Sequence, residues 1–307
     1  MRNAFADEIT QLGKSDSRVV LLSGDIGNKL FDPFKAQAPG RFFNCGVAEA
    51  NMMGVAAGMA LCGLRPVVYT ITPFTTTRCF EQIRVDVCYH KAPVVIVGTG
   101  SGLSYADLGP THHSCEDMAI LRTLPGMTVI APADSTELRM ALREALRLDG
   151  PVYMRIGKKG EPDIHRGAPQ LRIGRAITIR EGTDACLIST GVMASVVMAA
   201  AEILDRRGIR ARVESFHTVK PLDDATLVEV FSTFPVVAVI EEHGRIGGLA
   251  GGISEWLAAR GPHPGSLLSF GTDDVFMHEV GTQDYARRKF GLTAENIAEQ
   301  VAARIAR

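Results

Sequence analysis

A single carboxylate, Glu49, lies at the start of a run of small and apolar residues that spans residues 47–62. The run has no polar face, so it predicts a helix that is buried all round. Acidic residues favour the first turn of a helix because they meet the positive end of its dipole. A buried carboxylate must also pair with a cation or hold a proton, and the second state suits a general acid or base. Glu49 is therefore the first candidate catalytic residue.

A glycine-rich loop over residues 98–114 carries two adjacent histidines and Asp107. It follows an apolar run that predicts a strand, and open α/β sheets bind ligands at the carboxyl ends of their strands. Because histidine titrates near neutral pH, His112 or His113 is a candidate proton donor or acceptor. The alternative is a mobile surface loop. In an extended loop, His112 and His113 would point in different directions, which argues against a metal site.

Two further side chains lie in or just after predicted strands. Arg155 is in the run 152–156, and a guanidinium in such a buried strand must meet an anion. That anion is either an internal carboxylate or the phosphate or carboxylate of a substrate. Phe74 follows the strand predicted over residues 66–70, and it either joins the core or offers its face to a ring.

A second glycine-rich segment, over residues 241–252, has the strand-turn-helix setting of a phosphate-binding turn. However, Glu241 and Glu242 begin the segment and would repel a phosphate. No acidic residue suited to a ribose follows at the expected distance. The segment is therefore predicted to serve tight backbone packing rather than dinucleotide binding.

The elements that position these residues follow from the alternation of apolar runs with helical patterns. This alternation predicts an α/β fold with mainly parallel sheets covered by helices on both faces. Strands are predicted over residues 19–23, 42–44, 66–70, 94–98, 127–131, 152–156, 185–189, 209–215, 235–241 and 266–270, and a helix over residues 75–90. The pattern lapses where Gly, Pro, Lys and Glu dominate. We therefore expect a first domain over residues 1–160, a linker over 161–183 and a second domain over 184–307.

Composition narrows the class of protein. The chain has 307 residues, 46% of them hydrophobic and 22% charged, with a net charge of −1, as expected for a globular protein of two domains. The interspersed charges favour neither a nucleic acid nor a membrane surface as partner. No signal peptide or bilayer-length apolar run is present. The six cysteines are scattered, which predicts reduced thiols and a cytoplasmic location.

Several motifs together resemble those of the transketolase-type thiamine diphosphate enzymes. Residues 46–50 and 54–58, then 109–117, 124–127 and 131–134, resemble the pyrimidine-binding domain of that family. Residues 220–223, 241–243 and 247–248 resemble its C-terminal domain. The resemblance covers nearly the whole chain, and the order and spacing of the motifs make it specific.

The resemblance implies roles for the cofactor-side residues. Glu49 matches the acid that contacts the aminopyrimidine ring of thiamine diphosphate and stabilises its imino form. Phe74, with Ile71 beside it, matches the region whose side chains pack on that ring.

The resemblance also implies roles on the substrate side. His112 resembles the histidine that contacts substrate oxygens, and Arg155 resembles the arginine that binds the substrate phosphate. Arg2 and Asp25 fall near further substrate-contact positions. The family usually has an aspartate where this chain has Leu108, and Asp107 is the adjacent candidate substitute. Gly100 stands where many transketolases have a histidine, so the preference for donor or acceptor sugars could differ.

One family feature is missing from the sequence. Thiamine enzymes bind the diphosphate through Mg²⁺ held by a Gly-Asp-Gly…Asn segment, and residues 24–28 are too short and misplaced to serve. We therefore expect no metal ligand in this chain, and a partner that supplies the diphosphate-binding domain and Mg²⁺. The family suggests an α2β2 heterotetramer, with the active site between chains and residues 54–58 suited to close helix approach.

The sequence thus predicts the C-terminal subunit of a two-chain transketolase, which moves a two-carbon ketol unit from a phosphorylated ketose to an aldose. The alternatives are the beta subunit of a 2-oxo acid dehydrogenase and a deoxyxylulose-phosphate synthase-like enzyme. An alternative from another class is a noncatalytic Rossmann-like nucleotide-binding protein.

Overall fold

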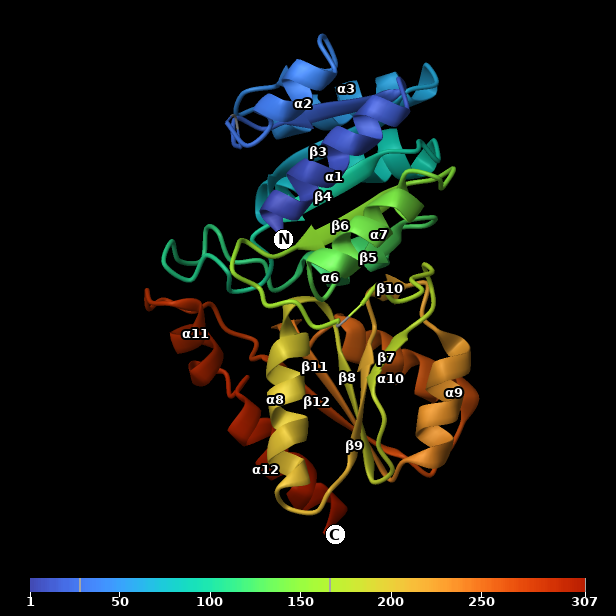
Figure 1. Cartoon of the computed structure of the whole chain (residues 1–307), viewed down its shortest axis with the longest axis vertical. Helices are drawn as coiled ribbons and strands as arrows, with labels where there is room; N and C mark the ends of the chain where they lie inside the picture. The colour runs from blue at the N-terminus through green and yellow to red at the C-terminus, as the bar shows by residue number, and fades with distance from the viewer. Residues whose placement is uncertain (28, 166, 307) are drawn as a thin grey trace.

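A computed structural model describes residues 1–27, 29–165 and 167–306. Two α/β units are stacked along the long axis of the molecule, with the first half of the chain above the second in Figure 1. Each unit is built on one sheet, and the sheets have seven and five strands. The predicted α/β class with two mainly parallel sheets is confirmed.

The first sheet has the strand order β10-β5-β6-β4-β3-β1-β2. Its neighbouring strands run parallel except for β10, which pairs antiparallel with β5. The strands are β1 (Val19–Ser23), β2 (Phe42–Asn44), β3 (Arg65–Ile71), β4 (Val95–Thr99), β5 (Thr128–Ile130), β6 (Val152–Ile156) and β10 (Thr218–Lys220). Since β10 comes from the second half of the chain, the two units share a sheet edge.

Helices cover both faces of this sheet because successive side chains of a strand point to opposite sides. Val20 and Leu22 pack toward the side of α3, whereas Val19 and Leu21 pack toward α1 and α7. The helical elements of this unit are α1 (Arg2–Ser15), α2 (Asp32–Gln37), α3 (Glu49–Leu61), α4 (Thr72–Thr75), the 3₁₀ turn η1 (Thr77–Cys79), α5 (Phe80–Gln82), the π-helix η2 (Ile83–Tyr89), α6 (Asp117–Arg122) and α7 (Ser135–Ala145).

Helix α3 differs from the prediction that it is buried all round. It buries Met52, Met53, Ala56 and Ala57, but its other face, which includes Val55, is exposed. Residues on one side of a helix recur every three to four positions, so an uncharged exposed face has the same composition as a buried one. The sequence alone could not separate the two faces.

The single helix predicted over residues 75–90 is broken into α4, η1, α5 and η2. Thr76 has φ −115° and ψ −84°, outside the helical region. The hydroxyls of Thr75 and Thr76 both donate to the carbonyl of Thr72, and that of Thr77 donates to the carbonyl of Pro73. Such side-chain bonds compete with helical ones, which explains the interruption.

The second sheet has the strand order β12-β11-β8-β9-β7. Its strands are β7 (Ile177–Arg180), β8 (Ala185–Ser189), β9 (Ala211–Ser215), β11 (Val236–Gly244) and β12 (Ser266–Thr272). Strand β7 pairs antiparallel with β9, so the segment 161–183, predicted as a linker, contains a strand of the second sheet. Residue 166 of that segment, like residue 28 of the segment 24–28, lies outside the described residues.

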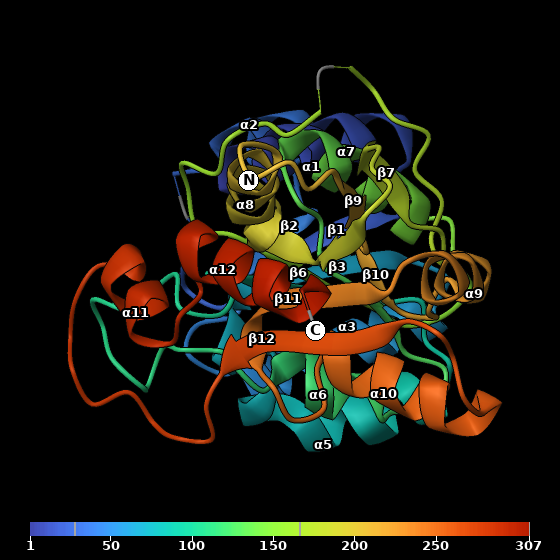
Figure 2. The ribbon, with the colours of Figure 1, turned by 90° about the horizontal axis from the view of Figure 1, so that it is seen from below.

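Helices also cover both faces of the second sheet, with α8 and α12 on one side and α10 on the other (Figure 2). The helical elements are the 3₁₀ turn η3 (Gly191–Met193), α8 (Ala194–Asp205), α9 (Asp224–Thr233), α10 (Leu249–Arg260), α11 (Gln283–Lys289) and α12 (Ala294–Ile305). One apolar cluster includes Met52 of α3 and Ile253 of α10, so the core is continuous between the two units.

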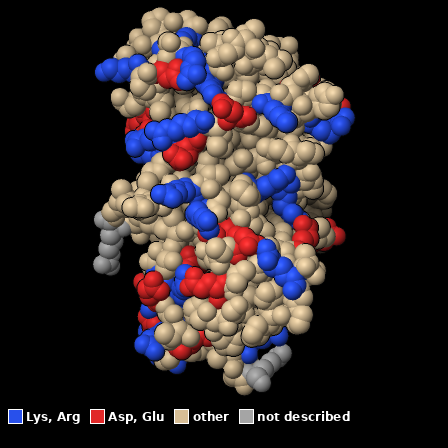
Figure 3. Space-filling view, turned by 90° about the vertical axis from the view of Figure 1, so that its right-hand side faces the viewer, with Lys and Arg blue, Asp and Glu red and all other residues tan. Residues whose placement is uncertain are grey.

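The surface is mixed in charge. On the face in Figure 3, Lys and Arg side chains are interspersed with Asp and Glu side chains, and broad areas carry neither. Among the helices of the described residues, none combines the length and the apolar composition needed to cross a membrane.

Candidate active site

Glu49 begins α3 and is only 3% exposed. Arg78, in η1, donates from Nη1 to its Oε1 at 2.9 Å. The guanidinium carbon of Arg78 also lies 4.0 Å from the ring centroid of Phe74. Of the two alternatives for a buried Glu49, the structure therefore shows pairing with a cation.

Phe74 connects this pair to the histidine loop. Its ring contacts that of His112 edge to face, with centroids 5.3 Å apart, and Tyr105 contacts the same imidazole at 6.0 Å. The hydroxyl of Thr111 lies 2.9 Å from Nδ1 of His112. Glu49, Arg78, Phe74, His112 and Tyr105 thus form one continuous cluster, which we call the Glu49–His112 cluster.

The loop that carries His112 is anchored from the second unit. The buried carboxylate of Glu242 accepts the backbone N–H of Leu103 at 2.8 Å and pairs with Arg287 of α11. Gly102 has φ +56°, and a Cβ there would lie 2.5 Å from the carbonyl oxygen of Glu242. Only glycine fits both the conformation and the space. The loop is therefore tied down at its base, unlike the freely mobile surface loop considered above.

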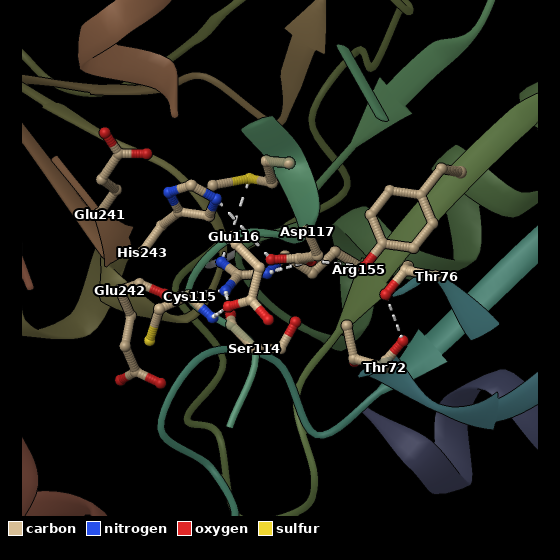
Figure 4. Close-up of polar contacts among 12 residues, drawn as sticks. Thr72, Thr76, Ser114, Cys115, Glu116, Asp117, Arg155, Glu241, Glu242 and His243 are labelled. Atoms are coloured by element: carbon tan, nitrogen blue, oxygen red, sulfur yellow. Dashed lines mark hydrogen bonds and ion pairs between the residues drawn. The ribbon is translucent and has the colours of Figure 1, made fainter. Parts of the chain in front are cut away.

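Arg155 lies away from the cluster in an internal ion pair, shown in Figure 4. Its Nε lies 2.9 Å from Oδ2 of Asp117, and its Nη2 donates to the carbonyls of Ser114 and Glu242. Burial alone would lower the pKa of this guanidinium, but the negative groups around it, Asp117 foremost with Glu242 beside it, together raise it.

This location corrects the substrate role that the resemblance implied for Arg155. The residue is 2% exposed, its Nη2 donates to two backbone carbonyls and its Nε faces Asp117, so almost no surface is left for a phosphate. The internal ion pair is the alternative that the structure shows.

The remaining predicted substrate residues lie on two sides of the cluster. Asp107 is exposed, and its Oδ1 lies 3.5 Å from Nζ of Lys158, which sits 4.2 Å from the ring centroid of Tyr105. Burial raises the pKa of Tyr105, and the positive charge of Arg2 partly offsets this, so Arg2 belongs to the same surroundings. His113 is a buried residue of the same loop, and burial lowers its pKa.

Asp25 lies beside the turn that leads into α3. Its Oδ1 accepts from the side-chain amide of Asn44 at 2.9 Å, and the amide oxygen of Asn44 accepts the backbone N–H of Gly46. Ile71 is the last residue of β3 and is half-buried directly before α4. No contact among the described residues joins Asp25 directly to His112.

Three residues of this region were missed from the sequence: Arg78, Tyr105 and Lys158. Arg78 stands four positions after Phe74, in the first turn of the helix predicted over residues 75–90, and that spacing could have suggested contact. Tyr105 and Lys158 carry no comparable signal, because residues far apart in the sequence bring them together.

The segment 241–252 packs as predicted. The carboxylate of Glu241 accepts the backbone N–H groups of Leu249 and Ala250 at the start of α10, at 2.8 and 3.0 Å. A Cβ on Gly248 would collide with the same carboxylate. The chain therefore places its own anion where a nucleotide phosphate would bind.

No group of three or more His, Cys, Asp or Glu side chains in the described part of the chain is arranged to hold a metal ion.

Comparison with known proteins gives the class. The family model "Transketolase, pyrimidine binding domain" matches residues 1–161, and "Transketolase, C-terminal domain" matches residues 174–297. The chain belongs to the transketolase family, and its relatives include subunits of split transketolases.

Three proteins illustrate the similarity. The 6-deoxy-6-sulfo-D-fructose transketolase subunit SqwH of Clostridium sp. (strain MSTE9) is 38% identical over 97% of this chain and 92% of its own length. A solved structure described as a split-gene transketolase, inactive beta4 tetramer, is 35% identical, with a TM-score of 0.91 over 99% of this chain and 98% of that chain. The 1-deoxy-D-xylulose-5-phosphate synthase of Heliobacterium modesticaldum is 33% identical over 96% of this chain but only 45% of its own length.

Proposed function

We propose that this chain is the C-terminal subunit of a two-chain, thiamine diphosphate-dependent transketolase that moves a two-carbon ketol unit from a phosphorylated ketose to an aldose. The observation that carries the proposal is the Glu49–His112 cluster. In it, the buried carboxylate of Glu49 accepts from the guanidinium of Arg78, which lies over the ring of Phe74, and that ring contacts the imidazole of His112. These are the groups that the family needs at one place.

The cluster fits the pyrimidine ring of the cofactor. Glu49 and Phe74 already hold a planar, nitrogen-bearing cation, the guanidinium of Arg78, between a carboxylate oxygen and a ring face. When bound, thiamine diphosphate supplies a carbanion-stabilising centre for the transferred unit. Glu49 would bind a ring nitrogen, Phe74 would pack on the ring, and Ile71 would line the same side.

The substrate side follows from the neighbours of His112. His112 would exchange hydrogen bonds with sugar hydroxyls, and it has Tyr105 beside it. Because Arg155 is unavailable, we assign the anionic end of the sugar to the surroundings of Arg2 and Lys158, with Asp107 at the rim. Asp25 remains a candidate contact near the start of α3.

The partner would be an N-terminal transketolase subunit that holds the diphosphate and Mg²⁺, in an α2β2 heterotetramer in the cytoplasm. The uncharged exposed face of α3 supports a protein partner, since it includes Val55 and Leu61, and Val47 stands exposed just before it. The solved split-gene relative is described as inactive in its tetramer of beta chains, which is consistent with partner-dependent activity.

The first experiment measures binding of thiamine diphosphate with Mg²⁺ by calorimetry, on this chain alone and after mixing with the product of a neighbouring gene for an N-terminal transketolase section. We expect tight binding only in the mixture. Tight binding to this chain alone would contradict the assignment of the diphosphate site to a partner.

A substitution tests the role of Glu49. Glu49→Gln keeps the shape of the side chain but removes its charge, so we expect turnover of the assembled enzyme to fall by at least about 10²-fold. The thermal midpoint of the assembly should stay close to that of the wild type. Turnover at the wild-type rate would rule out the role of Glu49.

A donor screen separates the related reactions. A requirement for pyruvate would indicate a condensation like that of the deoxyxylulose-phosphate synthases. The chain is also similar to these enzymes. Acyl transfer to a lipoyl group would indicate a 2-oxo acid dehydrogenase, although the polar side chains of Thr111 and His112 suit sugars better than acyl chains. Two-carbon transfer from a ketose phosphate supports the proposal.

A further inference from the structure

The pyrimidine site proposed above holds a side chain of this protein. We propose that Arg78 occupies this site in the unliganded chain, and that the aminopyrimidine ring must displace it before Glu49 can act. The inference rests on the proposed function for the identity of the incoming ring. The occupancy itself rests on contacts within this chain.

Arg78 makes both contacts that the ring would need. It donates an N–H to Oε1 of Glu49 at 2.9 Å, and its planar face lies 4.0 Å from the centroid of Phe74. A guanidinium is flat, cationic and well suited to stacking on an aromatic ring. Since Glu49 is 3% exposed, one planar group at a time can reach it from this side.

The position of Arg78 also allows it to leave. Its side chain is 43% exposed, whereas the side chain of Glu49 is 3% exposed. A guanidinium that moves outward from this site regains water, so its removal leaves no buried cation behind. Arg155 shows the contrasting case, with two backbone carbonyls and a carboxylate around a buried guanidinium.

Occupancy by Arg78 lowers the apparent affinity for the ring. A ligand that binds only the open form has its affinity reduced by the fraction of molecules that are open. We expect an ion pair with one exposed partner to close the site in roughly nine molecules of ten. Since about one molecule in ten is then open, the apparent affinity for the ring falls about tenfold. Removal of Arg78 should therefore tighten binding of the ring by about that factor.

The first test needs no ligand. Phenylglyoxal modifies accessible arginines, and mass spectrometry reports the rate at each residue. Glu49→Gln should speed modification of Arg78 several-fold. Arg84 is the internal control, because it pairs with Glu81 on the surface and should keep its rate. An unchanged rate at Arg78 would show that Glu49 does not hold it, and the proposal would fail while the proposed function stood.

The second test uses 4-amino-5-hydroxymethyl-2-methylpyrimidine as the probe, titrated into the full chain and followed by NMR. Arg78→Gln should bind the probe about tenfold more tightly than the wild type, and Arg84→Gln should bind like the wild type. If Arg78→Gln does not fold, Arg78→Lys replaces it, since an ammonium cannot stack as a plane.

The outcomes of the second test separate the two ideas. Equal or weaker binding by the Arg78 variant, with clear binding by the wild type, would overturn the occupancy and leave the pyrimidine site intact. Binding by none of the proteins would overturn the pyrimidine site itself, even if the modification rates show that Glu49 holds Arg78.

Discussion

Arg155 and Arg78 each pair with a buried carboxylate, yet their surroundings differ. The side chain of Arg155 is buried together with Asp117, and Arg78 is 43% exposed beside Glu49. Breaking a buried pair leaves a charge without water, whereas an exposed partner is solvated when it moves away. At the scale of the residue, burial makes Arg155 part of the internal packing, and the exposure of Arg78 fits its proposed place in the pyrimidine site.

The structural role of Arg155 can be tested through its partner. Asp117→Asn should lower the free energy of unfolding by about 3 kcal/mol, because it leaves the guanidinium buried without a counter-charge. Urea denaturation measures the change. Asp149→Asn is the matched control, since Asp149 pairs with Arg65 at the surface and should cost under about 1 kcal/mol. If Asp117→Asn instead keeps normal stability and raises the KM for phosphorylated sugars, Arg155 contributes to substrate binding.

A second prediction concerns pH. Burial would lower the pKa of His165, but its contact with Glu137 at 2.8 Å and the nearby charge of Asp134 together raise it. Because the pKa of His165 is higher in the folded state than in the unfolded state, protonation of His165 stabilises the fold. This stabilisation is complete at pH values below the unfolded pKa of about 6.5 and is lost as the pH rises through the folded pKa.

His165→Gln removes this protonation. The variant should therefore lose about 1 kcal/mol more relative to the wild type at pH 6 than at pH 8.5. Urea denaturation at both pH values provides the comparison. His90→Gln, at an exposed histidine, is the matched control. Equal losses for His165→Gln at the two pH values would refute the linkage.

At the scale of the element, the start of α10 shows how a helix end can resemble a ligand site without being one. The dipole and free N–H groups of a helix N-terminus attract an anion. Here the anion is Glu241, which lies within β11 and is fully buried. This arrangement leaves the nucleotide-binding alternative without a phosphate site in this segment.

Glu241→Ala should destabilise the protein by about 2 kcal/mol, because two backbone donors of α10 lose their acceptor. Urea denaturation again measures the change. Glu299→Ala, on the exposed side of α12, should stay within about 0.5 kcal/mol of the wild type. If both variants have the same free energy of unfolding, the hydrogen bonds from α10 to Glu241 contribute nothing measurable to stability.

At the scale of the whole molecule, the two units are joined by shared structure. Strand β10 of the second half completes the first sheet. Glu242, paired with Arg287, accepts a hydrogen bond from Leu103 and so holds the loop of His112 against the second unit. The exposed face of α3 lies on the first unit, next to the residue that the cofactor ring would meet. A partner docked on this face would therefore close the site.

Val55→Asp places a charge on that face, so we expect it to abolish assembly with the N-terminal subunit and leave the fold intact. Val228→Asp on α9 is the matched control, because the two valines are 39% and 41% exposed on helices. Sedimentation of each variant mixed with the partner measures assembly, and thermal unfolding checks the fold. If Val55→Asp assembles normally, the interface with the partner does not include this face of α3.

The fold class could be predicted from the amino-acid sequence, and so could the loops in which polar residues gather. These features depend on local periodicity and on motifs read in order, such as the acid Glu49 before a helix and the loop of His112. The pairing of charges could not be predicted, since Asp117 and Arg155, or Glu49 and Arg78, meet only when distant segments pack. The same holds for which face of α3 is exposed and for where the segment after β3 breaks, because burial and competing threonine hydrogen bonds are set by neighbours in space.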